Sequence, residues 1–239
     1  MATYVTADIH GEFEKFKRLI ERIDLKDEDT LYILGDIFDR GPHPLLTMTR
    51  VLEMPNVHCL IGNHELMALE CMEFLLQEIT DDSLLTLDDK IFGNLMTWYH
   101  NGAGTTIKEM QMFSPEGRRT ILDSIKEFSV YEELSVGDKD FLLVHAGLGN
   151  YRPDKDMDEY SLKELVWDRA DYDVQYFPDK YVITGHTPTQ LIKENPKLGF
   201  IFRNNNHIAI DCGACFPGGR LAAICLDTDE EFYVESEES

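Results

Sequence analysis

The chain has 239 residues, which fits one α/β domain or two small ones, and its 43% hydrophobic content is enough for a sizeable core. The formal net charge is −23, from 22 basic and 45 acidic residues. A field of that sign repels polyphosphate backbones, so we expect no nucleic-acid polymer as a partner. A phosphate-bearing substrate would have to be attracted by local positive charge, from metal ions or individual arginines.

The cysteines and the apolar runs bear on where the protein works. Five cysteines at irregular spacing indicate free thiols rather than a disulfide framework, which favours a cytoplasmic protein. No signal peptide precedes the first predicted strand, and no apolar run reaches the length of a membrane span, so we expect no membrane partner. The sequence does not indicate an oligomeric state.

In chain order, short apolar runs predict a series of strands. They span residues 4–7, 31–34, 57–61, 141–144, 181–184, 207–210, 221–226 and 232–234. Apolar residues at helical spacing lie between the first three runs, at 13–23 and 45–52. This β-α-β-α-β order predicts parallel pairing of the first three strands and right-handed crossovers.

The middle of the chain, from about 65 to 128, is predicted to be a helical insertion. Ser114 followed by Pro115 is a helix-start signature, with Ser114 as the N-cap and Pro115 at the first helical position. Acidic residues dominate 227–239 and predict a solvated tail. Because no linker divides the chain, we expect a single α/β domain over 1–239.

Five short clusters of polar residues and glycine follow predicted strands. They read Asp8-Ile9-His10-Gly11, Gly35-Asp36-Ile37-Phe38-Asp39-Arg40-Gly41, Gly62-Asn63-His64-Glu65, His145-Ala146-Gly147 and Gly185-His186-Thr187. Open α/β sheets bind their ligands at the carboxyl ends of the strands, so we expect these clusters to converge in space. The glycines let the backbone turn sharply there and let a ligand approach closely.

Six side chains in these clusters are candidate metal ligands: Asp8, His10, Asp36, Asn63, His145 and His186. A mixed nitrogen and oxygen donor set without thiolate suits Mn²⁺, Fe or Zn²⁺. Asp36 offers two oxygens and can bridge two ions. Two divalent ions roughly 3.5–4 Å apart would clamp an in-line displacement at phosphorus.

Single members of this set also have ordinary structural explanations. Asp8, Asp36 or Asn63 alone would be interpreted as a turn or helix-cap residue. Glu65 is predicted to be structural, as an acidic residue favoured by the dipole at a helix N-terminus. The occurrence of the whole set in register with five predicted strands favours a functional site.

The same clusters resemble the motifs of the phosphoprotein phosphatase family, the Ser/Thr phosphatases of the calcineurin-like metallophosphoesterase superfamily. That family carries GDxHG, GDxVDRG, GNHE, HAG and GH in this order, and this chain matches all five except for Ala7 and Phe38. Leu165-Val166-Trp167-Asp168-Arg169 is similar to a segment of the small phage and bacterial members. The resemblance implies a fold of two mixed β-sheets packed as a sandwich and flanked by helices.

The resemblance also implies roles for the matched residues. Asp8, His10 and Asp36 would hold a first metal ion, and Asp36, Asn63, His145 and His186 a second, with Mn²⁺ as the expected metal in both places. A hydroxide between the metals would attack phosphorus in line. His64 would be the general acid, oriented by Asp39, and Asn63, Arg40 and Arg169 would bind the substrate phosphate.

These roles predict a metal-dependent phosphomonoester hydrolase, most simply a serine/threonine protein phosphatase acting on a phosphorylated protein or a small phosphoester. An alternative is a symmetrical bis(5'-nucleosyl)-tetraphosphatase, although such enzymes tend to read GNHD and to lack the residue matched by Asp39. Another alternative is a degenerate phosphatase that serves as a binding module. Residues 78–112 and 154–159 are candidate specificity segments, because long insertions beside a rigid site commonly carry substrate choice.

Overall fold

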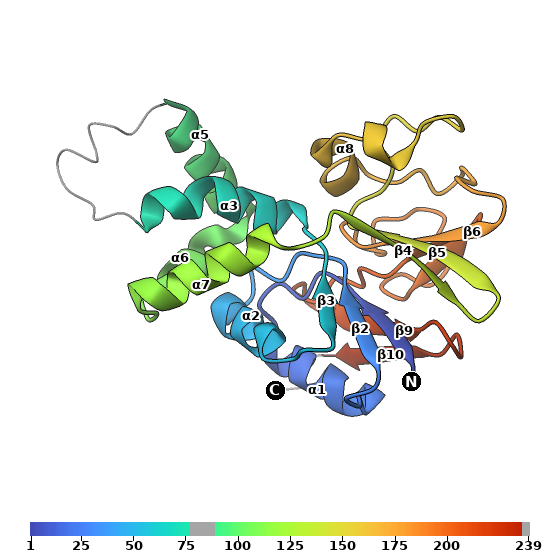
Figure 1. Cartoon of the computed structure of the whole chain (residues 1–239), viewed down its shortest axis with the longest axis horizontal. Coiled ribbons are helices and arrows are strands. Elements are labelled where there is room, and N and C mark those ends of the chain that lie inside the picture. The colour runs from blue at the N-terminus through green and yellow to red at the C-terminus, as the bar shows by residue number, and fades with distance from the viewer. Residues whose placement is uncertain (77–88, 236–239) are drawn as a thin grey trace.

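The computed structural model describes residues 1–76 and 89–235 (Figure 1). Within these ranges two five-stranded sheets form the centre of the molecule. The first has the strand order β10-β9-β1-β2-β3, and the second has the order β4-β5-β6-β8-β7. Residues 77–88 of the predicted insertion and 236–239 of the predicted tail lie outside the described residues.

In the first sheet, the parallel pairing predicted for the first three strands is confirmed. β1 pairs with β2 and β2 with β3 in parallel, while β9 joins β1 in the antiparallel direction, which makes the sheet mixed. The helices between them match the predicted ranges. The bounds are β1 (Thr3–Thr6), α1 (Phe13–Ile23), β2 (Thr30–Ile33), α2 (Pro44–Leu52), β3 (Val57–Cys59), β9 (Arg220–Cys225) and β10 (Glu231–Glu235).

The second sheet is also mixed, because β5, β6 and β8 are parallel and the two edge strands are antiparallel to their neighbours. The two edge strands, β4 and β7, were not among the predicted strands. The bounds are β4 (Tyr131–Val136), β5 (Lys139–Val144), β6 (Lys180–Thr184), β7 (Phe202–Asn204) and β8 (His207–Ala209).

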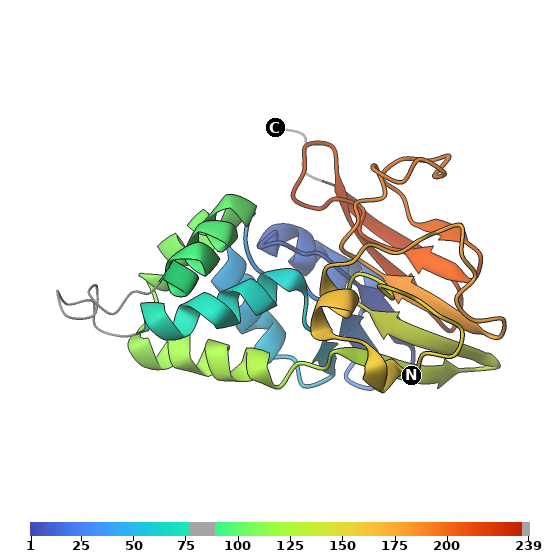
Figure 2. The ribbon, with the colours of Figure 1, turned by 90° about the horizontal axis from the view of Figure 1, so that it is seen from above.

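The described part of the middle region is helical, as expected. It contains α3 (Asn63–Leu75), α5 (Asp89–Trp98), a π-helical turn η1 (Tyr99–Ala103), α6 (Gly104–Met110) and α7 (Pro115–Lys126). Ser114 caps α7 as predicted, since its Oγ accepts a hydrogen bond from the Gly117 N–H at 3.1 Å. Figure 2 shows that these helices gather on one side of the sheets.

The core lies in layers. One apolar cluster fills the space between the two sheets, where Val5 of β1 and Leu34, which directly follows β2, meet Leu143 and Ile183 of the second sheet. Another packs the helices against the outer face of the first sheet. A third packs α8 (Leu162–Val166) and the short 3₁₀ turn η2 (Met157–Glu159) against the second sheet. This α/β sandwich is the predicted fold class. Among the described helices, none combines the length and the apolar character that crossing a membrane requires.

Candidate metal and phosphate site

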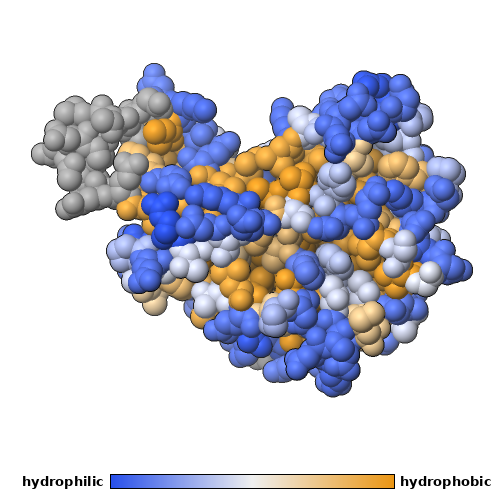
Figure 3. Space-filling model, viewed as in Figure 1, coloured by the Kyte–Doolittle hydropathy of each residue, from blue (hydrophilic) through white to orange (hydrophobic). Residues whose placement is uncertain are grey.

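All of the predicted metal ligands follow strands and come from both sheets. Asp8 and His10 follow β1, Asp36 follows β2, and Asn63 opens α3 after β3. His145 and His186 follow β5 and β6 of the second sheet. Figure 3 shows the outline of the molecule hollowed between the helical insertion and α8. The site therefore depends on the two sheets being packed together.

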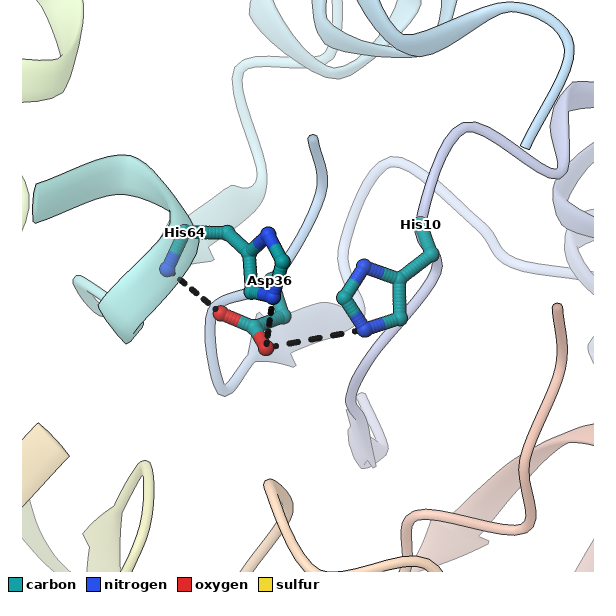
Figure 4. Close-up of side chains that lie close together, drawn as sticks. All are labelled: His10, Asp36 and His64. Carbon is teal, nitrogen blue, oxygen red and sulfur yellow. Dashed lines mark hydrogen bonds and ion pairs between the residues drawn. The ribbon is translucent and has the colours of Figure 1, made fainter. Parts of the chain in front are cut away.

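One group of potential ligands centres on Asp36 (Figure 4). The Nε2 atom of His10 lies 3.6 Å from Asp36 Oδ2, and the Nε2 atom of His64 lies 3.9 Å from the same oxygen. The Nδ1 atom of His10 lies 2.8 Å from the carbonyl oxygen of Phe38. Because that carbonyl can only accept, the ring presents Nε2 as its free lone pair, which is the form that binds a metal.

A second group surrounds the other oxygen of Asp36. The Nε2 atom of His145 lies 3.4 Å from Asp36 Oδ1 and 3.0 Å from Asn63 Oδ1. His186 Nδ1 lies 2.8 Å from the same Asn63 oxygen. The Nδ1–H of His145 donates to the carbonyl of Leu34 at 2.6 Å, so its Nε2 also faces inward. Asp36 thus lies between two sets of donors, and both sets combine oxygen with imidazole nitrogen, which fits a divalent cation.

Asp8 approaches from the side of His186. Both of its carboxylate oxygens accept from the backbone N–H of His186, at 2.9 and 3.0 Å. Burial raises the pKa of Asp8 well above its usual range, and the negative charges of Asp211 and Asp36 add to this. Buried carboxylates that lie close together repel one another when ionised. A cation bound between them would relieve this repulsion, so such a place favours cation binding.

The backbone at these residues is strained. A positive φ is uncommon for residues other than glycine, and it costs about 1–3 kcal/mol where it is held against preference. Six predicted site residues have one, which is more than half of the eleven such residues in the described chain: Asp8, His10, Asp36, Asp39, Arg40 and His186. Strain of this kind concentrates at functional sites, where the surrounding fold holds it in place.

The pKa values of Asp36 and of the histidines around it shift in different directions. Burial alone would raise the pKa of Asp36, but the neighbouring imidazoles of His145, His64 and His10 hold it far below its usual range. Burial, followed by the nearby His64, lowers the pKa of His10 well below its ordinary value. His64 differs. The negative charge of Asp36 and the hydrogen bond between His64 and Asp39 raise the pKa of His64 in spite of burial.

The residues predicted to act on the phosphate, His64, Asp39 and Arg40, lie together beside Asp36. The Nδ1 atom of His64 lies 2.6 Å from Asp39 Oδ2, and both side chains are fully buried. The exposed Arg40 reaches inward, with its guanidinium 2.7 Å from His10 Nε2 and 3.0 Å from His64 Nε2. Arg169 is exposed beyond α8. Its charge contributes, after burial and His145, to the lowering of the His186 pKa to about 3, which places it near the site.

Sequence reasoning missed Asp211. It follows β8, and its carboxylate accepts from the Gly213 N–H at 2.8 Å. Burial raises its pKa to about 7, with a contribution from Asp36, while Arg40 and Arg169 act in the opposite direction. The carboxyl-end rule that located the other residues would have located this one, since Asp211 comes directly after a predicted strand.

The fold and this site together define a class: an α/β sandwich with a dinuclear-type set of oxygen and nitrogen ligands at the strand ends. The chain belongs to the calcineurin-like phosphoesterases, whose family model matches residues 1–190. This is a family of dinuclear metal-dependent phosphoesterases.

Among its relatives are several bacterial enzymes named symmetrical bis(5'-nucleosyl)-tetraphosphatase. The one from Delftia acidovorans is 35% identical over 101 residues, which cover 41% of this chain and 36% of the relative. The one from Psychromonas ingrahamii is 33% identical over 101 residues, covering 41% of this chain and 37% of the relative. The matched segment thus spans little more than a third of each relative.

Solved structures share the fold at low sequence identity. A proposed diadenosine tetraphosphatase superimposes with a TM-score of 0.66 at 16% identity, covering 98% of this chain and 92% of the other. A Saccharomyces cerevisiae protein serine/threonine phosphatase gives 0.55 at 13% identity, covering 100% and 81%. A cold-active protein-tyrosine phosphatase of a Shewanella species gives 0.52 at 15% identity, covering 98% and 80%. These likenesses show the fold alone.

Proposed function

We propose that this protein hydrolyses symmetrical dinucleoside tetraphosphates to two nucleoside diphosphates. The observation that carries the proposal is the match to relatives of that name at 33–35% identity over about 100 residues. The motifs alone favour a serine/threonine protein phosphatase. The relatives favour the alternative, the dinucleoside tetraphosphatase, which is therefore proposed first.

The residues that would hold the metals are those predicted from the sequence. Asp8, His10 and Asp36 would bind one ion, and Asp36, Asn63, His145 and His186 the other. Bound divalent ions would supply an activated water and neutralise charge on the phosphate. The lone pair of His10 Nε2 that now accepts from Arg40 would then be used by the metal. Arg40 would be released from this imidazole to bind a phosphate oxygen, a task that suits a guanidinium.

An aromatic ring lies beside the proposed phosphate-binding arginine. The Arg40 Cζ atom is 5.8 Å from the centre of the Phe216 ring, and Phe216 is 43% exposed. An exposed ring next to a phosphate-binding residue can stack on a nucleobase, because every base offers a π-face. This position supports a nucleotide substrate, and Arg169 would bind a further phosphate oxygen of the chain.

A second candidate, hydrolysis of phosphoserine and phosphothreonine esters, is favoured by one observation. His64 and Asp39 form a buried pair at 2.6 Å, the arrangement of an imidazole poised to donate a proton from its other nitrogen. An alkoxide leaving group needs that proton. A nucleoside diphosphate needs it much less, because a phosphate has a second pKa of about 6 and leaves as a stable anion. An intact acid pair is thus of most use on a phosphomonoester.

The two candidates are separated by their products. The Mn²⁺-loaded protein would be incubated in parallel with diadenosine tetraphosphate and with a peptide carrying phosphoserine and phosphothreonine. Nucleotides would be resolved by anion-exchange chromatography and free phosphate by colorimetry. Asp36→Asn protein serves as the matched control for contaminating phosphatases.

We expect ADP as the single nucleotide product and faster turnover of the dinucleotide than of the peptide. Faster release of phosphate from the peptide would make the protein phosphatase the correct function. Formation of ATP and AMP would exclude symmetrical cleavage. If the wild type and Asp36→Asn protein were equally inactive on both substrates, both candidates would be wrong.

A further inference from the structure

The carboxylate of Asp39 receives more than the hydrogen bond from His64. The indole Nε1–H of Trp98 donates to Asp39 Oδ2 at 2.8 Å, and the hydroxyl of Thr106 donates to Asp39 Oδ1 at 2.5 Å. The backbone N–H of Asp39 in turn donates to Thr106 Oγ1 at 3.2 Å. Trp98, Thr106 and Asp39 are all fully buried. Oδ2 therefore accepts from two side chains, His64 and Trp98, and Oδ1 accepts from Thr106.

The two donors come from the helical insertion. Trp98 is the last residue of α5, and Thr106 lies in the first turn of α6, on the other side of η1. Neither residue belongs to a strand-end motif. A buried carboxylate without enough donors is costly, so these two side chains offset the cost of burying Asp39 and fix the plane of its carboxyl group.

The chain between these two residues also holds Arg40. The Arg40 N–H donates to the carbonyl oxygen of Gly102 at 3.0 Å, and Arg40 Nε donates to that of Asn101 at 3.4 Å. Gly102 has a φ of 110°, and a Cβ atom there would come within 2.7 Å of Arg40 Cγ. Glycine is thus required for the insertion to pack this closely on Arg40.

We propose that Trp98 and Thr106 are positioning residues that orient Asp39 and, through it, His64. The segment 98–106 would then be part of the reaction apparatus, because it fixes both the acid pair and the backbone of the phosphate-binding arginine. This inference rests on the proposed role of His64 as the proton donor. It assigns the described part of the insertion a task besides the substrate choice that we predicted for residues 78–112.

The test uses leaving groups of different basicity. Phenol is a far weaker acid than p-nitrophenol, so phenyl phosphate depends strongly on proton donation and p-nitrophenyl phosphate depends on it little. Thr106→Val removes the hydroxyl with almost no change of volume, and Trp98→Phe removes the indole N–H. We expect each variant to lower kcat for phenyl phosphate about tenfold more than kcat for p-nitrophenyl phosphate, the size expected for one lost hydrogen bond to a charged group.

Two further variants control for structural damage. Thr106→Ser keeps a hydroxyl and should restore most of the phenyl phosphate activity. Thr105→Val makes the same change one residue earlier, where the buried Oγ1 has no hydrogen-bond partner in the described chain. It should leave the ratio of the two activities unchanged. A simple loss of folded protein would lower both activities equally and would leave the ratio at the wild-type value.

A second readout does not require turnover. In the Zn²⁺-loaded, diamagnetic protein, the His64 Nδ1–H that donates to Asp39 should give a proton NMR signal far downfield, absent in His64→Asn. We expect Thr106→Val and Trp98→Phe to shift it upfield, and Thr105→Val to leave it in place. If the wild type hydrolysed neither diadenosine tetraphosphate nor a phosphomonoester and yet showed these shifts, the proposed function would fail while the positioning role stood. An unmoved signal together with an unchanged activity ratio would overturn the inference.

Discussion

Two neighbouring histidines in this site, His10 and His64, have different hydrogen-bond partners. The rings of His10 and His64 lie edge to face with their centres 4.7 Å apart. The Nδ1 of His10 faces the carbonyl of Phe38, whereas the Nδ1 of His64 faces the carboxylate of Asp39. A full negative charge stabilises an imidazolium far more than a carbonyl dipole does. Together with Asp36, which also raises the His64 pKa, this difference supports the proposed roles of His10 as a neutral ligand and His64 as a proton donor.

Replacement of His64 by Asn should separate chemistry from metal binding. Because general acid catalysis commonly contributes about 10²- to 10⁴-fold, we expect kcat for a phosphomonoester to fall by a factor in this range. Metal content, measured by mass spectrometry of the desalted protein, should stay at the wild-type level. Asp36→Asn is the contrasting variant and should lose both metal and activity. A turnover near wild type in His64→Asn would show that His64 is not the acid.

At the level of single residues, the sequence located those whose position follows from strand ends. Asp8, Asp36 and Asn63 belong to this group because a carboxyl end is recognisable from the apolar run before it. Trp98 and Thr106 could not be located in this way. They reach Asp39 from about 60 residues further along the chain, through the packing of helices whose mutual orientation no local pattern encodes.

At the scale of elements, Glu65 connects the start of α3 to the loop after β2. Its Oε2 accepts from the backbone N–H groups of Asp36 and Gly62, at 2.7 and 2.9 Å. Its Oε1 accepts from those of Ile37 and Phe38, at 2.8 and 3.2 Å. We predicted a structural acid at a helix N-terminus. The four contacts add that it fixes the loop that carries Asp36.

Replacement of Glu65 by Gln should destabilise the protein. One carboxylate oxygen becomes an amide NH₂ group that faces two backbone N–H donors. These two N–H groups lose their acceptor, and the Glu65 side chain they face is fully buried. We expect a loss of about 3 kcal/mol in the free energy of unfolding. For a chain of this size that is a fall in melting temperature of about 10 °C. Calorimetry of the metal-free protein would measure it.

The matched control for that change is Glu70→Gln, on the exposed side of the same helix. It should shift the melting temperature by no more than about 2 °C, as surface substitutions usually do. Equal shifts in both variants would mean that the contacts of Glu65 add nothing beyond a general preference for acid in this helix.

The two strands that the sequence did not predict have a common physical reason. β4 and β7 are the edges of the second sheet and pair on one side only. In β4 the Glu133 and Ser135 side chains are exposed, and in β7 Arg203 is exposed. An edge strand can be polar along one face, so its apolar run is too weak to stand out from a loop. The edge strands of the first sheet, β3 and β10, were found because they overlap the more apolar runs 57–61 and 232–234.

At the scale of the whole molecule, folding buries a histidine that binds no metal in the proposed scheme. His207 in β8 is 1% exposed, with its Nε2 2.8 Å from Thr184 Oγ1 and its ring packed on Tyr172. Its Nδ1 has no hydrogen-bond partner among the described residues. Burial lowers the pKa of His207 to about 3. In the unfolded chain this histidine has an ordinary pKa of about 6.5.

This difference predicts a loss of stability in acid. Between pH 6.5 and 3 the unfolded state binds a proton at His207 that the folded state does not, so stability falls as the pH falls through this window. Between pH 6.5 and 5 the loss amounts to about 2 kcal/mol. The free energy of unfolding would be measured with urea at both pH values, for the wild type and for His207→Gln. The difference between the two proteins isolates the contribution of His207 from that of the many carboxylates. Parallel losses in the two proteins would contradict the assignment.

The predicted metal ligands come from both sheets. Asp8, His10 and Asp36 are attached to the first sheet, whereas His145 and His186 are attached to the second. A cation held by both would crosslink the halves of the sandwich in the folded state alone. Its binding would also offset repulsion in a chain of net charge −23, at the place where buried carboxylates are concentrated.

Mn²⁺ should therefore raise the melting temperature of chelator-treated protein. At a free concentration one hundred times the dissociation constant, a single site adds about 2.7 kcal/mol. That is roughly 5–10 °C for a chain of this length. Sodium chloride of equal ionic strength is the control, because screening alone also relieves self-repulsion.

Asp36→Asn should respond to sodium chloride as the wild type does and lose the additional response to Mn²⁺. If Asp36→Asn kept the full Mn²⁺ response, the stabilising ion would bind elsewhere, and the residues at the strand ends would not form the metal site.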